Sequence, residues 1–219
     1  MKRILLIKLQ IIIMLLYSQE IMAQSQSPNT AEDFMARGVD YLFDEDFDRA
    51  IADFTQVIRL VPNSAGAYCN RGDAYAGKGD FDRAIADYNQ SIRLRPNDYE
   101  AYNGRGLVYD QIDDFDKAIA DFTQVIRLYP DFLFGYLNRG YAYLGKEDLD
   151  HAIEDFTQSI NRMPSSEAFL ARGSAYFDKG EYARAIPDFE QALKGVVMIH
   201  SDQLLARELL DEAKRKLGR

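Results

Sequence analysis

The sequence predicts an all-α fold: an α-solenoid of stacked helix-turn-helix repeats, closed by a C-terminal capping helix. One observation is an Arg-Gly pair that recurs at spacings of 34, 34, 34 and 33 residues, with its arginines at Arg37, Arg71, Arg105, Arg139 and Arg172. A second is a longer block, DFDRAIADFTQVIRL in its first copy, which recurs in step from Asp46, Asp80, Asp114 and Asp148 and in altered form from Glu181. Internal repetition at this period is typical of stacked helical units.

The composition favours a folded helical protein and excludes several function classes. Of 219 residues, 47% are hydrophobic and 28% charged, with 14 Gly and 6 Pro, which favours helix over a strand-rich fold. A single cysteine excludes a disulfide framework, and with two histidines it leaves no Cys/His cluster for zinc. The net charge of -9 argues against nucleic acid as a partner, because binding a phosphate backbone needs concentrated Lys and Arg.

The first residues have the layout of an export signal. A basic start, Met1-Lys2-Arg3, precedes a mostly apolar stretch that ends at the small residue Ala23, as in a cleavable secretory signal. We predict that residues 1–23 are a signal peptide, that residues 24–30 are a polar tether, and that the protein is exported, to a periplasm or out of the cell. The alternative is an uncleaved segment that anchors the chain to a membrane through residues 4–22.

Each repeat is predicted to be a pair of antiparallel helices. In the second repeat, one helical face carries Tyr68, Arg71, Gly72 and Tyr75. A break at residues 77–79 follows, and Asp80 is placed to cap the next helix. The buried stripe of that second helix is expected to hold Phe81, Ala84, Tyr88 and Ser91.

The repeats are expected to cover one another. Prolines end the first four of them, at Pro62, Pro96, Pro130 and Pro164. Because one helix pair cannot bury its own apolar faces, neighbouring pairs must do so. We predict a five-repeat domain over residues 31–199 and a capping helix over residues 200–219. The apolar stripe of that helix is expected to hold Leu204, Leu205, Leu209, Leu210, Ala213 and Leu217.

These repeats resemble the tetratricopeptide repeat family. Its 34-residue unit has aromatics at positions four, eleven and twenty-four, small residues at eight, twenty and twenty-seven, and Pro at thirty-two. The fourth repeat, which starts at Leu133, matches with Tyr136, Gly140, Tyr143, Ala152, Phe156, Ser159 and Pro164. The resemblance covers about residues 31 to 195. It implies a scaffold that binds other proteins and is not an enzyme.

One departure from the family pattern is an arginine at the seventh position of every repeat, where Leu is usual. An aspartate recurs at the twenty-third position, as Asp53, Asp87, Asp121, Asp155 and Asp188. We predict that these arginines and aspartates pair between helices in a ladder that fixes how the units stack. Whether they pair within one repeat or between repeats is open at this point.

No arrangement of residues indicates a catalytic or metal site. His151 and His200 have no partners at ligand spacing, and Cys69 has no His-Asp pair near it in sequence. The acidic run 44–48 begins like a calcium loop, but Arg49 stands where that loop needs Gly. We therefore expect no catalytic residue, no metal, no cofactor and no small-molecule substrate.

The remaining candidate site is the exposed stripe of each first helix, which in the resembling family lines a concave groove. Carried over position by position, the partner-binding residues are Met35, Val39, Asn70, Asp73, Asn103, Leu107, Asn138 and Tyr141. A carboxamide both donates and accepts, so the asparagines suit a peptide backbone. The expected partner is a protein or peptide with apolar anchors and some positive charge. The alternative is a self-associating structural component of an envelope complex, a homo-oligomer.

Overall fold

The computed structural model describes residues 30–194 and 200–218, and within these ranges the chain forms helices and no strand. Five helix pairs follow one another: α2 (Ala31–Phe43) with α3 (Phe47–Leu60), α4 (Ala65–Gly77) with α5 (Phe81–Leu94), α6 (Tyr99–Gln111) with α7 (Phe115–Leu128), α8 (Gly135–Gly145) with α9 (Leu149–Arg162), and α10 (Ser166–Asp178) with α11 (Tyr182–Ala192). Helix α12 (His200–Lys216) ends the row. The predicted all-α solenoid is confirmed.

Four sequence-based predictions fall wholly or partly outside these ranges. The predicted signal peptide, residues 1–23, lies outside the described residues, as do residues 24–29 of the predicted tether, residues 195–199 of the predicted repeat domain and residue 219 of the predicted capping helix. Thr30, the last residue of that tether, is the N-cap of α2. Its hydroxyl accepts from the backbone N–H of Asp33 at 3.1 Å, so the repeat array begins with a capped helix.

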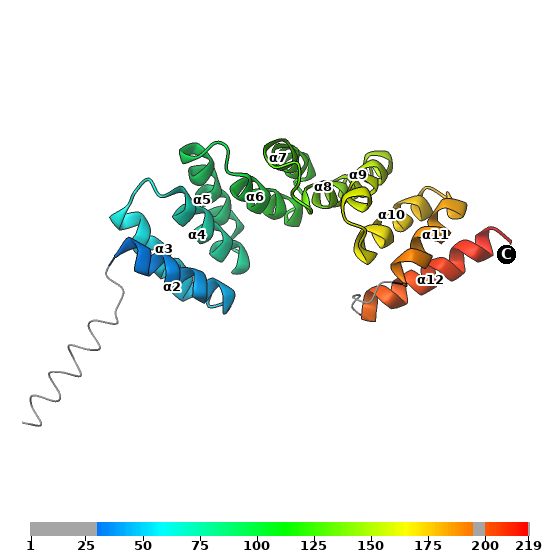
Figure 1. Ribbon diagram of the computed structural model, residues 1–219, viewed down its shortest axis with the longest axis horizontal. Helices are drawn as coiled ribbons and strands as arrows, with labels where there is room; N and C mark the ends of the chain where they lie inside the picture. Colours follow the sequence, from blue (N-terminus) through cyan, green and yellow to red (C-terminus); the bar gives the residue numbers. More distant parts are fainter. Residues whose placement is uncertain (1–29, 195–199, 219) are drawn as a thin grey trace, which may run out of the picture.

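The helix pairs stack into a curved arc that runs from α2 at one end to α12 at the other (Figure 1). Each helix packs against the next along the chain, and the first helices of neighbouring repeats also approach one another, α2 with α4, α4 with α6, α6 with α8 and α8 with α10. Among the described residues, the second helices make no such approach to each other. The first helices therefore form the crowded inner face of the arc, and the second helices form its outer side.

Glycine at the eighth repeat position lets the two helices of each pair approach closely. A Cβ on Gly140 would lie 2.6 Å from the Phe156 ring, and that ring is fully buried. The same approach joins Gly38 to Phe54, Gly72 to Tyr88, Gly106 to Phe122 and Gly173 to Phe189. The hairpin geometry is therefore set by five glycine–aromatic pairs.

The turn inside each pair repeats as closely as the helices do. One residue in each turn has a positive φ: Glu45, Gly79, Asp113, Glu147 and Gly180. An acidic N-cap follows, and the predicted cap at Asp80 is confirmed, because its carboxylate accepts from the backbone N–H of Arg83 at 3.3 Å. The turns thus orient every second helix in the same way.

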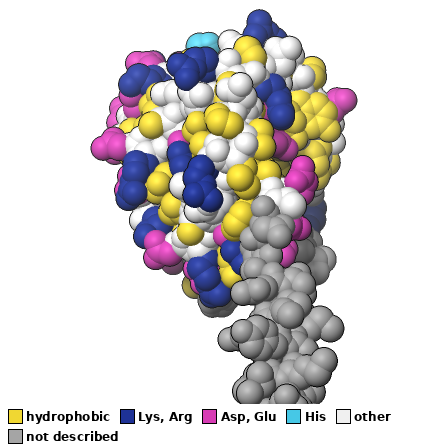
Figure 2. Space-filling view, turned by 90° about the vertical axis from the view of Figure 1, so that its left-hand side faces the viewer, with side chains coloured by type: hydrophobic (Ala, Val, Ile, Leu, Met, Phe, Trp, Pro, Cys, Tyr) yellow, Lys and Arg dark blue, Asp and Glu magenta, His cyan; other side chains and the backbone are white. Residues whose placement is uncertain are grey.

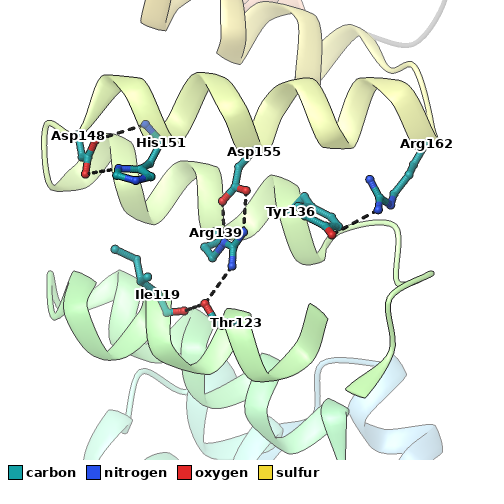
Figure 3. A network of polar contacts seen from close by, with 8 residues as sticks. All are labelled: Ile119, Thr123, Tyr136, Arg139, Asp148, His151, Asp155 and Arg162. Carbon is teal, nitrogen blue, oxygen red and sulfur yellow. Dashed lines mark hydrogen bonds and ion pairs between the residues drawn. The ribbon is translucent and has the colours of Figure 1, made fainter. Parts of the chain in front are cut away.

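The predicted Arg–Asp ladder is present, and its ion pairs join the two helices of one repeat. Arg139 of α8 donates to both carboxylate oxygens of Asp155 in α9, at 2.7 and 2.8 Å. The third guanidinium nitrogen reaches back to the preceding repeat and donates to Thr123 at 3.0 Å (Figure 3). The bond to Asp155 raises the pKa of Arg139, so the cation is held at any accessible pH.

The other repeats contain the same contact. The bidentate pairs are Arg37–Asp53, Arg71–Asp87, Arg105–Asp121 and Arg172–Asp188. The bonds back to the preceding repeat are Arg71 to Thr55, Arg105 to Asn89 and Arg172 to Thr157. Each arginine after the first therefore binds its own repeat through Asp and the preceding repeat through a neutral side chain, which supports the predicted role in stacking.

One helix begins later than the sequence predicts, and another contains a proline. Helix α8 begins at Gly135, two residues after the predicted start at Leu133. In the loop before α8, Phe132 packs on the ring of Tyr99, the first residue of α6, at a centroid distance of 5.4 Å. Helix α11 continues through Pro187, although proline has no N–H to donate to the helix.

The capping helix α12 is where predicted, but its buried face is narrower. It packs on α11 and α10, and Ala206, Leu210 and Ala213 are buried. Leu204 and Leu205 are each 45% exposed, and Leu217 is also exposed, so the predicted stripe was wrong at these three positions. Residues at i, i+4 and i+7 share one helical face, and the leucines fall beside that face. In the described part of the chain, no helix has the length and apolar character needed to span a bilayer.

Candidate partner-binding groove

The inner face of the arc contains two hollows. The central hollow, of about 590 Å³, lies between α4 and α6 and is bounded by the loop before α8. Its lining is Cys69, Asn70, Asp73, Ala76, Gly77, Tyr88, Tyr99, Glu100, Asn103, Gly104, Leu107, Val108, Gln111 and Phe132. A second hollow, of about 340 Å³, is lined by Leu107, Asp110, Asp113, Phe115, Phe122, Asn138 and Tyr141. Leu107 borders both, so they form one continuous surface, here called the groove.

The structure brings together six of the eight residues proposed from the sequence. Asn70, Asp73, Asn103 and Leu107 line the central hollow, and Leu107, Asn138 and Tyr141 line the second. Met35 and Val39 line neither hollow and are half-buried in the first repeat, packed against the cluster of Ala50, Phe54 and Ala74. The array therefore places the candidate surface on the second, third and fourth repeats.

The asparagines along the groove are linked from repeat to repeat. Asn138 donates to the Asn103 carbonyl oxygen at 3.1 Å, and Asn70 donates to the Met35 sulfur at 3.6 Å. A carboxamide has two N–H donors and two lone pairs, so one such bond uses only part of its capacity. These bonds fix the orientation of the amides.

The central hollow contains a hydrogen-bonded polar pair, a buried tyrosine and a half-buried aspartate. The Tyr88 hydroxyl donates to the Asp73 carboxylate at 2.6 Å, and Tyr88 is fully buried. Burial raises the pKa of Asp73, the bond from Tyr88 opposes this, and the negative charges of Glu100 and Asp98 add to the rise. Burial and the Asp73 charge also raise the pKa of the Tyr88 hydroxyl, which stays protonated as the donor.

Cys69 lies in the same hollow and remains a thiol. It is buried, and burial, together with nearby carboxylates, raises its pKa. A thiolate is the reactive form of cysteine, so this environment suppresses its reactivity. Among residues 30–194 and 200–218, no three His, Cys, Asp or Glu side chains are grouped to hold a metal ion.

A family model described as tetratricopeptide repeat matches residues 35–93, 69–132 and 137–196. The chain belongs to the tetratricopeptide repeat family. No curated protein sequence matches the chain. The family typically consists of non-catalytic interaction scaffolds, and the present chain has the scaffold fold.

Solved structures similar to this tetratricopeptide repeat chain agree with that assignment. A crystal structure of MamA protein shares 27% identity, with 75% of this chain and 90% of that chain covered and a TM-score of 0.68. MamA from Desulfovibrio magneticus RS-1 shares 22%, with 76% and 95% covered and a TM-score of 0.71. YrrB, described as a TPR protein with an unusual peptide-binding site, shares 18%, with 88% and 96% covered and a TM-score of 0.67. The last two show likeness of fold alone.

Sequence reasoning missed four tetratricopeptide repeat residues that shape the central hollow: Tyr88, Tyr99, Gly104 and Phe132. A signal was present for Tyr88, because the other repeats have Phe at its position: Phe54, Phe122, Phe156 and Phe189. Gly104 likewise replaces the Ala or Asn of the other repeats: Ala36, Asn70, Asn138 and Ala171. Departures from a repeat consensus therefore point to the hollow more directly than the consensus does.

Proposed function

We propose that this chain is a non-enzymatic scaffold that binds a protein segment in the groove of its second to fourth repeats. The observation that carries the proposal is the continuous inner surface formed by the two hollows, where amides, carboxylates and apolar side chains alternate. A peptide laid along such a surface can bond its backbone to the amides and bury its apolar side chains beside Leu107. MamA and YrrB share the fold, and YrrB is described as having a peptide-binding site.

Selection of peptides with matched variants tests this function. Random peptides of about twelve residues, which span about 40 Å when extended, are displayed and selected on the full chain. Binding is then measured on the double variant Asn103→Ala/Leu107→Ala; Leu107 is 43% exposed, so its loss should leave the repeat core intact. The control double variant Arg93→Ala/Arg127→Ala changes exposed side chains of α5 and α7, on the outer side.

We expect selected peptides to lose at least tenfold in affinity on the groove variant, about 1.4 kcal/mol, and to keep their affinity on the control. Circular dichroism verifies that both variants are folded. Peptides that bind both variants as well as the unaltered chain would place the binding surface elsewhere and overturn the proposal.

We also propose that the protein is exported, on the basis of the signal-like start of residues 1–23. Expression of the full chain with a C-terminal tag, cell fractionation and N-terminal sequencing test this. Export with cleavage should give a chain that begins at Gln24. A chain that retains Met1 in the membrane fraction would instead support the anchor formed by residues 4–22.

Self-association is a second candidate function, favoured by apolar side chains exposed at both ends of the arc. At the α2–α3 end, Phe43 is 88% exposed, and Leu60 and Val61 are also exposed; at the other end are Leu204 and Leu205 of α12. Figure 2 looks onto the α2–α3 end and shows apolar side chains scattered among charged ones. Contact of one end with the other would join copies head to tail.

Light scattering of the full chain distinguishes this candidate. If it is right, the unaltered chain forms oligomers and Leu204→Glu/Leu205→Glu is monomeric. The control Leu133→Glu changes an exposed leucine away from both ends and should keep the oligomer. A strictly monomeric chain at high concentration would remove this candidate.

A further inference from the structure

The central hollow is built from three departures from the repeat pattern that depend on one another. Asp73 stands at the ninth repeat position, where the other repeats have Val39, Leu107, Tyr141 and Ser174. Tyr88 replaces Phe and carries the hydroxyl that bonds to Asp73 at 2.6 Å. Gly104, in the next repeat, leaves room for that hydroxyl: a Cβ there would lie 2.8 Å from the Tyr88 oxygen. Side chains from two repeats thus hold one carboxylate in place.

The charged side chains that line the central hollow are all acidic. Asp73 and Glu100 line it, and the lining contains no Lys or Arg among the described residues. Asp98 adds negative potential at Asp73, and Arg95, the basic residue nearby, forms an ion pair with Asp98 at 3.2 Å. An anionic group entering this hollow would be repelled, and an apolar group would cover the Asp73 carboxylate without giving it a charged partner.

The walls of the hollow suit a cation as well. Tyr99 and Phe132 line it and pack on each other at a ring-centroid distance of 5.4 Å. Aromatic faces attract ammonium and guanidinium groups, most strongly where water is excluded. The volume of about 590 Å³ lies in the range of ligand sites and leaves space beside the carboxylate for a long side chain.

From these observations we propose that the central hollow is a specificity pocket for one basic side chain, an arginine or lysine, of the bound protein segment. The cationic head pairs with Asp73, and Glu100 at the rim attracts it as it enters. The stem of the side chain lies against the aromatic wall. This inference rests on the proposed function of the groove and adds the residue type that the groove selects.

Selection with matched charge variants tests the proposal. The random peptides described above are selected on the full chain, and a bound peptide is resynthesised with citrulline, which is neutral, at each basic position in turn. Binding is measured on the full chain and on Asp73→Asn, whose carboxamide oxygen can still accept from Tyr88. The control Asp82→Asn removes the same charge from an exposed residue of α5 outside the groove. Glu100→Gln is a second variant at an exposed position that does not affect the core.

We expect groove-binding peptides to share one arginine or lysine. Its replacement by citrulline should weaken binding to the full chain at least tenfold and leave binding to Asp73→Asn unchanged. Asp73→Asn should lose at least tenfold, Glu100→Gln about threefold, and Asp82→Asn nothing. Groove-dependent peptides without a shared basic residue, or equal losses on Asp73→Asn and Asp82→Asn, would overturn this inference and leave the groove function standing. Peptides insensitive to Asn103→Ala/Leu107→Ala would instead overturn the groove function.

Discussion

Removing an aspartate of the Arg–Asp ladder should cost more stability in the third repeat than in the first. In the third repeat, Asp121→Ala would leave the Arg105 guanidinium without its charged partner in a site where the arginine side chain is 19% exposed. Removing one partner of such a pair costs about 3 to 5 kcal/mol, because the remaining charge is buried and unpaired. In the first repeat the arginine, Arg37, is 40% exposed and water can solvate it. Asp53→Ala should therefore cost only about 1 kcal/mol.

Urea denaturation of the full chain, followed by far-UV circular dichroism, measures both losses. The double variant Arg105→Met/Asp121→Ala removes the stranded charge and should recover at least about 1 kcal/mol of the loss caused by Asp121→Ala. Equal losses for Asp121→Ala and Asp53→Ala, or a double variant less stable than the single, would refute the idea that burial of an unpaired charge sets the magnitude.

Three further predictions concern single positions. Gly140→Ala should cost about 1 to 3 kcal/mol, because its Cβ would meet the Phe156 ring, whereas Gly66→Ala, with open space around it, should gain about 1 kcal/mol in the same urea assay. Pro187→Ala should raise the free energy of unfolding by about 1 to 3 kcal/mol, since it restores a helix hydrogen bond in α11; no gain would show that the helix accommodates the proline without strain. Burial raises the pKa of the Asp73 carboxyl in the folded chain above its value in the unfolded chain, about 3.9. The folded state therefore loses stability as pH rises from that value through the folded pKa, and Asp73→Asn should stabilise the chain at pH 7 but not near pH 4. Equal gains at both pH values would contradict this.

The fold was predictable because each repeat applies the same local rules. The helix pairs follow from the spacing of Gly140 and its equivalents to the aromatic sixteen residues later, and the ladder from Arg and Asp at the same separation. The features of the fold that the sequence did not predict depend on single side chains. Leu204 and Leu205 fit an amphipathic stripe, but α11 and α10 cover only the face of Ala206, Leu210 and Ala213.

The candidate groove was predictable in position but not in shape. Family positions placed Asn103, Leu107 and Asn138 on the inner face, where the structure has them. The central hollow requires the approach of the Tyr88 hydroxyl to Asp73 and of its ring to Gly104, residues from two repeats. Contact across a repeat boundary depends on how far one unit rotates against the next, and one sequence without its coordinates does not give that rotation.

The central claim, that the inner face of the arc binds a protein segment, is tested most directly by hydrogen exchange of the full chain with and without a selected peptide. Binding in the groove should slow exchange most in α4, α6 and α8 and less in α5, α7 and α9, because the first helices supply most of the residues that line the two hollows. Protection confined to the second helices, or to α12, would contradict the claim.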